Sequence, residues 1–125
     1  MTTIIDTPEL GRLLVESAAR DRDRIAAQAL AEEETILALP KVRRLLVVED
    51  RGRPTARWEN LMGHQYTLNL NRPQFAFLGL VLSILSMGHI ALAAVEDLDE
   101  RRLLIIQRAI LQLSGNNTIA VGTRV

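Results

Sequence analysis

The sequence predicts a soluble α+β domain in which helices pack on one face of a small antiparallel sheet of three or four strands. Three observations lead to this fold class. The chain carries no charge from Pro73 to Val95, a length that suits a central apolar helix. Residues 64–71 (HQYTLNLN) alternate in polarity, as a half-buried strand does. Amphipathic helical patterns occupy residues 8–39 and the second half of the segment 73–114.

Composition and charge narrow the possible functions. The chain has 125 residues, the size of one domain, so residues 1–125 are predicted to form a single domain. The 15 basic and 15 acidic residues cancel, and without a basic excess we expect no nucleic-acid partner. The absence of cysteine from the sequence excludes disulfides and thiolate metal sites. Residues 1–10 lack the basic region and apolar run of a signal peptide, so we expect a cytoplasmic protein.

The N-terminal segment, residues 8–39, is predicted to be helical. Asp6 is placed to cap the helix, and Pro8 suits its first turn. One helix of this length would be about 48 Å long, which is more than a domain of this size is wide. We therefore expect either two helices joined near residues 20–24 (RDRDR) or one projecting arm. That stretch and Glu32–Glu34 indicate a solvent-exposed face, with a charged rim around a partner-binding surface as the alternative.

The sheet-forming segment is predicted to be residues 42–71. Residues 42–49 (VRRLLVVE) are rich in β-branched side chains and suit a buried strand, and residues 55–60 suit a second strand. Residues 50–54 form the turn between them, because glycine and proline both interrupt a strand. Trp58, which lies between two charged residues, is interpreted as an anchor at the edge of the core.

The helical pair follows, in residues 73–114. The first helix, residues 73–95, can be capped by Asn71 or Arg72 and has Pro73 in its first turn. It is apolar almost all round and has to be covered on most sides. The second is expected to begin with a capping box at Asp97 and to end at Gly115. The buried face of the second helix is expected to consist of Leu103, Ile106, Ile110 and Leu113.

Residues 118–125 form the last segment. Their side chains alternate along the chain as in a strand, so we predict a final strand, paired within the sheet or with a neighbouring subunit.

One narrow face of the first helix carries small and polar side chains at spacings of three and four residues. Such a stripe permits the close approach of another backbone. The candidate helix-packing or interface face consists of Ala76, Gly79, Ser83, Ser86 and Ala93. His89 lies in the same apolar stretch and is interpreted as a neutral core residue with one hydrogen-bond partner. The alternative for His89 is a polar link across an interface.

The sequence contains no HExxH, GxSxG, P-loop or dinucleotide-binding motif. No catalytic, cofactor-binding or metal-binding residue is therefore predicted, and no cofactor. A helix that is apolar on nearly every side is difficult to cover with the surface of one copy. We expect a small non-enzymatic structural or interaction protein that self-associates or joins a larger assembly with another protein, of the kind found in phages or mobile elements.

Two alternatives stay open. Residues 75–95 are long enough to span a membrane, and the arginines before them and acidic residues after them are arranged as in a single-span membrane protein. A small enzyme without a recognisable motif would need His64, Tyr66, Trp58 or carboxylates to converge in one pocket.

Overall fold

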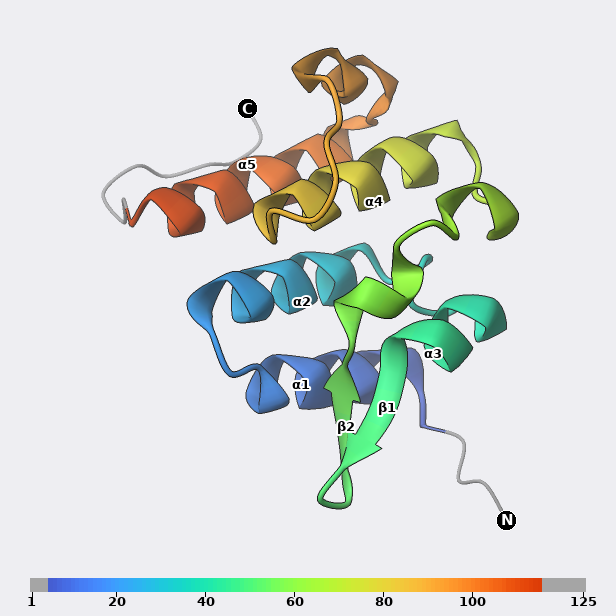
Figure 1. Ribbon diagram of the computed structural model, residues 1–125. Helices are drawn as coiled ribbons and strands as arrows, with labels where there is room; N and C mark the ends of the chain where they lie inside the picture. The colour runs from blue at the N-terminus through green and yellow to red at the C-terminus, as the bar shows by residue number, and fades with distance from the viewer. Residues whose placement is uncertain (1–4, 116–125) are drawn as a thin grey trace.

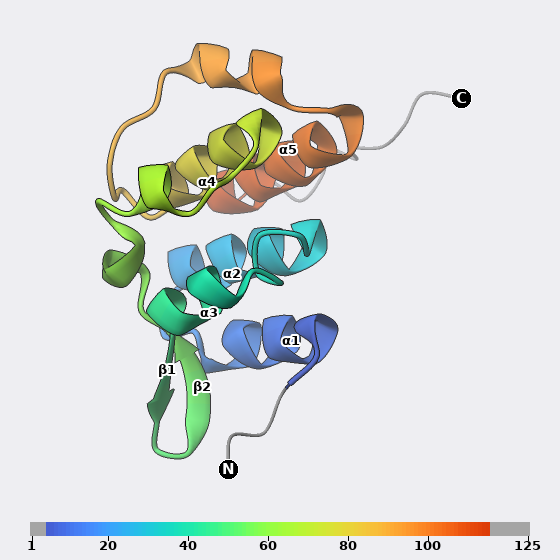
Figure 2. The ribbon, with the colours of Figure 1, turned by 90° about the vertical axis from the view of Figure 1, so that its right-hand side faces the viewer.

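The computed structural model describes residues 5–115, which form helices stacked in three layers and one small sheet (Figure 1). The main helices are α1 (Thr7–Ser17), α2 (Asp21–Glu33), α3 (Pro40–Leu46), α4 (Arg72–Ile84) and α5 (Glu100–Ser114). Figures 1 and 2 show α1 in one outer layer, α2 in the middle, and α4 with α5 in the other outer layer. Because α2 contacts α1, α4 and α5, it is α2, and not the segment 73–95, that is the central helix.

The N-terminal segment forms two helices, so of the two alternatives the joined pair is confirmed. Asp6 caps α1, and its Oδ1 accepts a hydrogen bond from the backbone N–H of Glu9 at 2.9 Å. The charged stretch RDRDR begins α2, whose N-cap is Arg20. The two helices touch at Gly11, where an added Cβ atom would lie 2.6 Å from the Cβ atom of Ala31. The missing side chain is what permits this close contact.

The sheet is a hairpin of β1 (Val47–Asp50) and β2 (Arg53–Ala56), which pair antiparallel. The first strand begins at residue 47, because residues 40–46 form α3 with its proline in the first turn. Arg51 and Gly52 connect the strands with φ angles of 55° and 77°, as a tight hairpin turn requires. Pro54, expected in the turn, lies in β2 opposite Glu49. The predicted combination of helices with an antiparallel sheet is confirmed.

The expectation of three or four strands is not confirmed, since the sheet within residues 5–115 has two. The predicted strand at residues 55–60 is short and gives way to a 3-10 helix, Trp58–Leu61, and the predicted strand at residues 64–71 contains another, Gln65–Thr67. Asn69 adopts a φ angle of 56°, which an extended strand does not allow. Alternation over so few residues is therefore compatible with irregular backbone. The strand predicted for residues 118–125 lies outside the described residues.

The predicted continuous helix over residues 73–95 is wrong, because α4 ends at Ile84. Its start agrees with the prediction: Asn71 and Gln74 form a reciprocal capping box. After Leu85 the chain leaves the helix, and Ser86 and Gly88 adopt φ angles of 60° and 84°. A short 3-10 helix, η3 (Leu92–Asp97), follows. Among the helices described, none combines the length and the apolar character needed to cross a membrane.

Helix α5 ends at Gly115 as predicted, with a φ angle of 77°, but it begins elsewhere and faces another way. Its N-cap is Asp99, two residues later than expected. The buried face consists of Ile105, Ile106 and Ala109, with Arg102 in line with them. Of the four residues expected in the core only Ile106 is buried, and two of the others, Ile110 and Leu113, are 49% and 41% exposed.

Candidate functional site

The connection between α4 and α5 is shaped by the direction of these two helices. They lie side by side and run the same way (Figure 1), so the chain has to return from the end of α4 to the start of α5. Residues 85–98 make this return and are called the strap below. At its start, Ser86 accepts a hydrogen bond from Arg22 of α2 at 3.0 Å. At its end, Asp97 forms an ion pair of 3.0 Å with Arg72, the first residue of α4. The strap therefore runs back along the whole of α4.

In its middle the strap makes a close apolar contact with α4. Ile90 lies directly over Gly79, and a Cβ atom at Gly79 would overlap the terminal methyl group of Ile90. Nearby, the hydroxyl group of Ser83 donates to the carbonyl oxygen of Gly79 at 3.0 Å and is thereby satisfied within its own helix. Figure 2 shows the strap passing over α4 on the side away from α2.

Most of the strap, residues 85–95, carries no formal charge. From Leu85 to Val95 the chain has no Asp, Glu, Lys or Arg, and most of the exposed side chains are small. Leu92 is the large exception and is 76% exposed. We call the exposed residues of this run the strap surface: Ser86, Gly88, His89, Ala91, Leu92 and Ala93.

The candidate interface residues do not share one helical face. Ala76, Gly79 and Ser83 lie on α4, where Ala76 is buried and the other two are half-buried. Ser86 and Ala93 lie on the strap and are exposed. The reason is the end of α4 at residue 84, after which the helical spacing no longer applies. Their role in an interface stays a prediction.

The two histidines lie on different segments, and the other proposed enzyme residues differ in their exposure. His89 is exposed on the strap, so its interpretation as a core residue is wrong, and its role as a polar link is untested. His64 is exposed in the loop before α4, whereas Trp58 is buried in the core at 4% exposure. Tyr66 is 85% exposed and packs against Phe75, with the ring centroids 5.1 Å apart. Neither groove described below is lined by any of these side chains.

A buried ion pair that the sequence analysis missed joins α2 to α5. Glu33 is fully buried and pairs with Arg102, whose Nη2 lies 2.7 Å from Oε2 of Glu33. Its other oxygen, Oε1, accepts from the backbone N–H of Ile36 at 2.9 Å, and the hydroxyl group of Thr35 donates to Oε2. One signal was present: Glu33 lies three and four residues after Leu30 and Ala29, in register with the apolar face of α2.

Further polar contacts surround this pair. Arg101 donates to the carbonyl oxygen of Glu33 at 3.1 Å, Gln74 donates to Thr35 at 3.0 Å, and Asp99 lies 2.9 Å from Arg102. The Glu33 cluster is defined as Glu33, Thr35, Gln74, Asp99, Arg101 and Arg102. Throughout residues 5–115 each buried polar side-chain atom has a hydrogen-bond partner, and no group of three acidic, histidine or cysteine residues could hold a metal ion. The cluster therefore stabilises the junction of three helix ends and leaves no buried polar atom of its own unsatisfied.

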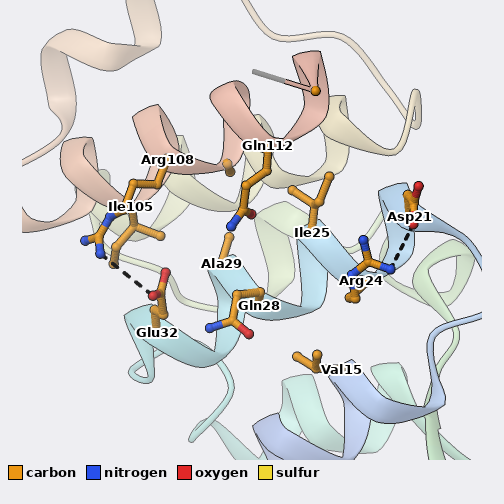
Figure 3. Close-up of a pocket in the computed structure, with 12 residues that line it drawn as sticks. Val15, Asp21, Arg24, Ile25, Gln28, Ala29, Glu32, Ile105, Arg108 and Gln112 are labelled. Atoms are coloured by element: carbon orange, nitrogen blue, oxygen red, sulfur yellow. Dashed lines mark ion pairs between the residues drawn. The ribbon is translucent and has the colours of Figure 1, made fainter. Parts of the chain in front are cut away.

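Two shallow grooves adjoin on the face formed by α1, α2 and α5. The α2–α5 groove has a volume of about 410 Å³ (Figure 3). Its apolar floor contains Ile25 and Ile105 with two alanines, and ion pairs stand at its rim, Asp21 with Arg24 at 2.8 Å and Glu32 with Arg108 at 4.0 Å. The α1–α2 groove, of about 440 Å³, is lined by Pro8, Gly11, Arg12, Val15, Glu16, Gln28, Ala31, Glu32 and Glu34.

The groove walls carry charged and polar groups. Their lining includes carboxylates, guanidinium groups and amides. Beside the α1–α2 groove, the hydrogen bond from Arg12 lowers the pKa of Glu9, and the same hydrogen bond raises the pKa of Arg12. Both groups are therefore charged at neutral pH.

Comparison of the chain with protein-family models, with curated proteins and with solved structures finds no match.

Proposed function

We propose that this protein is a small non-enzymatic interaction protein that associates with further copies of itself through the strap surface, as a homo-oligomer or as a component of a larger assembly. The observation that carries the proposal is Leu92, which is 76% exposed within an uncharged run of eleven residues, 85–95. Water contact with apolar surface is unfavourable, and an exposed apolar patch of this kind is typical of an interaction site.

A second copy is the partner that fits the charge of the strap surface. In a two-fold contact the same patch meets itself, so like charges would face like charges. The run 85–95 contains no Asp, Glu, Lys or Arg, so contact between two copies of this run brings no like formal charges together. The strap is also held at both ends by Arg22 and Arg72 and in the middle by Ile90. A surface that is ordered before binding loses less conformational freedom when it binds.

The test is the oligomeric state of Leu92→Arg, measured by light scattering after size exclusion. A two-fold contact would lose two buried leucines and gain two unpaired charges, so we expect the association constant to fall at least about a hundredfold. Leu92 is mostly exposed, so its replacement should change the free energy of unfolding by no more than about 0.5 kcal/mol.

Ile110→Arg is the matched control. Ile110 is 49% exposed on α5, outside the strap, so an interface at the strap predicts unchanged association for this variant. A native protein that stays monomeric at high concentration would contradict the proposal. So would a result in which Ile110→Arg disrupts association and Leu92→Arg does not.

A further inference from the structure

Charge is segregated between two parts of the molecule. Residues 41–60, which include α3 and the hairpin, contain six basic and three acidic residues, a net charge of +3. Residues 5–34, which include α1 and α2, contain four basic and eight acidic residues, a net charge of −4. A chain without net charge therefore has one positive and one negative region, and oppositely charged surfaces on two copies attract each other.

The positive region ends in a projecting tip. The turn of the hairpin extends past α1, away from the α4–α5 layer (Figures 1 and 2). Arg51 and Arg53 at this tip are exposed, and neither guanidinium group forms an ion pair or hydrogen bond with any residue in the range 5–115. Arg51 also adopts a φ angle of 55°, a position in a tight hairpin turn that asparagine or glycine occupies with less strain.

The negative region contains a groove of suitable shape and charge. The α1–α2 groove presents Glu16, Glu32 and Glu34 against one cation, Arg12. That cation is already held between two carboxylates, Glu16 at 2.7 Å and Glu9. The floor is formed by small and apolar residues, among them Gly11, Val15 and Ala31. An arginine can lay its aliphatic stem on such a floor while its guanidinium group pairs with carboxylates at the rim.

We propose that the hairpin tip of one copy docks in the α1–α2 groove of a second copy, where Arg51 and Arg53 pair with Glu16 and Glu34. The contact joins two different surfaces, so it is heterologous and builds either a closed ring or an open chain of copies. The inference rests on the proposed function only in taking the protein to self-associate, since it uses surfaces other than the strap.

The test exchanges the charges of the two surfaces in the Leu92→Arg background, which removes the strap contact. One variant carries Arg51→Glu and Arg53→Glu, and the other carries Glu16→Lys and Glu34→Lys. Each alone places like charges in the contact, so we expect the association constant of each to fall about ten- to a hundredfold. Mixed in equal amounts, the two variants again present opposite charges, and association should return. Recovery in the mixture also shows that both variants are folded.

Salt dependence and controls complete the experiment. Association should weaken between about 0.1 M and about 1 M salt, as the Debye length falls from about 10 Å to about 3 Å. Arg44→Glu and Glu100→Lys reverse exposed charges outside the contact and should change nothing.

Two results would overturn the inference: association that is unaffected by either double reversal, or a mixture that stays dissociated. If the two double variants associate only when they are mixed, the contact of the hairpin tip is supported. If Leu92→Arg alone has no effect on association, the strap interface is refuted, and the two proposals are thereby distinguished. A third result would also overturn the inference: a protein that binds single-stranded DNA through Arg51 and Arg53 but does not bind a second copy. The partner of the hairpin tip would then be a polyanion.

Discussion

The Glu33 cluster buries a charged side chain, whereas the strap exposes an apolar one. Glu33 belongs to a run of three glutamates and is fully buried, whereas Leu92 belongs to an uncharged run and is 76% exposed. The cluster connects three helices through hydrogen bonds and ion pairs, while the strap lies along α4 with Ile90 over Gly79, a hydrogen bond to Arg22 near its start and an ion pair with Arg72 near its end.

The difference follows from the directions of the helices. The C-terminal end of α2 and the N-terminal ends of α4 and α5 meet at Glu33. Helix ends carry backbone groups without helical partners, so polar side chains are needed there even in the interior. The parallel course of α4 and α5 forces the chain to return outside α4, which leaves apolar residues on the surface. Burial in this fold is therefore decided by chain direction as well as by hydrophobicity.

The largest expected effect would come from removing one partner of the buried pair. Arg102→Met leaves the carboxylate of Glu33 buried without its counter-charge, and such a loss typically costs about 3–5 kcal/mol. Urea unfolding of the variant and the native protein measures this cost. Arg108→Met is the control: Arg108 is half exposed and 4.0 Å from Glu32, so its removal should cost less than about 1 kcal/mol. Equal costs for the two variants would show that burial of the pair does not matter.

The helices and their caps were the most predictable part of the fold. Asp6, Asn71 and Gly115 occupy the terminal positions that their side chains or conformational freedom favour. These signals are local, because a cap and its partner are three or four residues apart. The broken helix after Ile84 could not be read in the same way, since an apolar run does not reveal where neighbouring helices force it to end.

The Glu33 cluster and the strap surface were less predictable, because both depend on contacts between residues far apart in the sequence. Nothing near Glu33 in the sequence indicates a partner 69 residues away. The exposure of Leu92 depends on the return of the chain along α4. Gly79 was predicted to permit the close approach of another backbone, and the sequence could not indicate that the group above it would be the side chain of Ile90 of the same chain.

Two glycine-to-alanine changes, with effects of intermediate size on the free energy of unfolding, compare the contact between α1 and α2 with the contact between the strap and α4. At Gly11 the added methyl group would lie 2.6 Å from the Cβ atom of Ala31 and 3.3 Å from its Cα atom, which the helix holds in place, so we expect a loss of about 1–3 kcal/mol. At Gly79 the added methyl group meets the end of the Ile90 side chain, which can turn aside. Alanine also favours a helix over glycine by about 1 kcal/mol, so Gly79→Ala should be neutral within about 1 kcal/mol.

Denaturant midpoints of the two variants, with unchanged m-values, provide the measurement. Gly79→Ala/Ile90→Ala is the matched double variant and tests whether any cost at Gly79 comes from Ile90. If Gly79→Ala were as costly as Gly11→Ala, the strap would be as rigid as the helix contact, and the contrast between the two regions would fail.

The smallest effect is expected at a surface charge, Glu9, whose ion pair with Arg12 is the exposed counterpart of the buried pair. The hydrogen bond from Arg12 lowers the pKa of Glu9 in the folded protein below its ordinary value. A carboxyl group with a lowered pKa stabilises the fold above its ordinary pKa, and this contribution is lost as the pH falls through the lowered value. The stability difference between the native protein and Glu9→Gln should therefore shrink as the pH is lowered from about 7 to about 3. Unfolding midpoints measured across this range, with and without Arg12→Ala, provide the check. Because Glu9 is exposed, the pH-dependent difference should disappear with Arg12→Ala and diminish in high salt, and a difference that persists in both conditions would mean that the pair with Arg12 is not its cause.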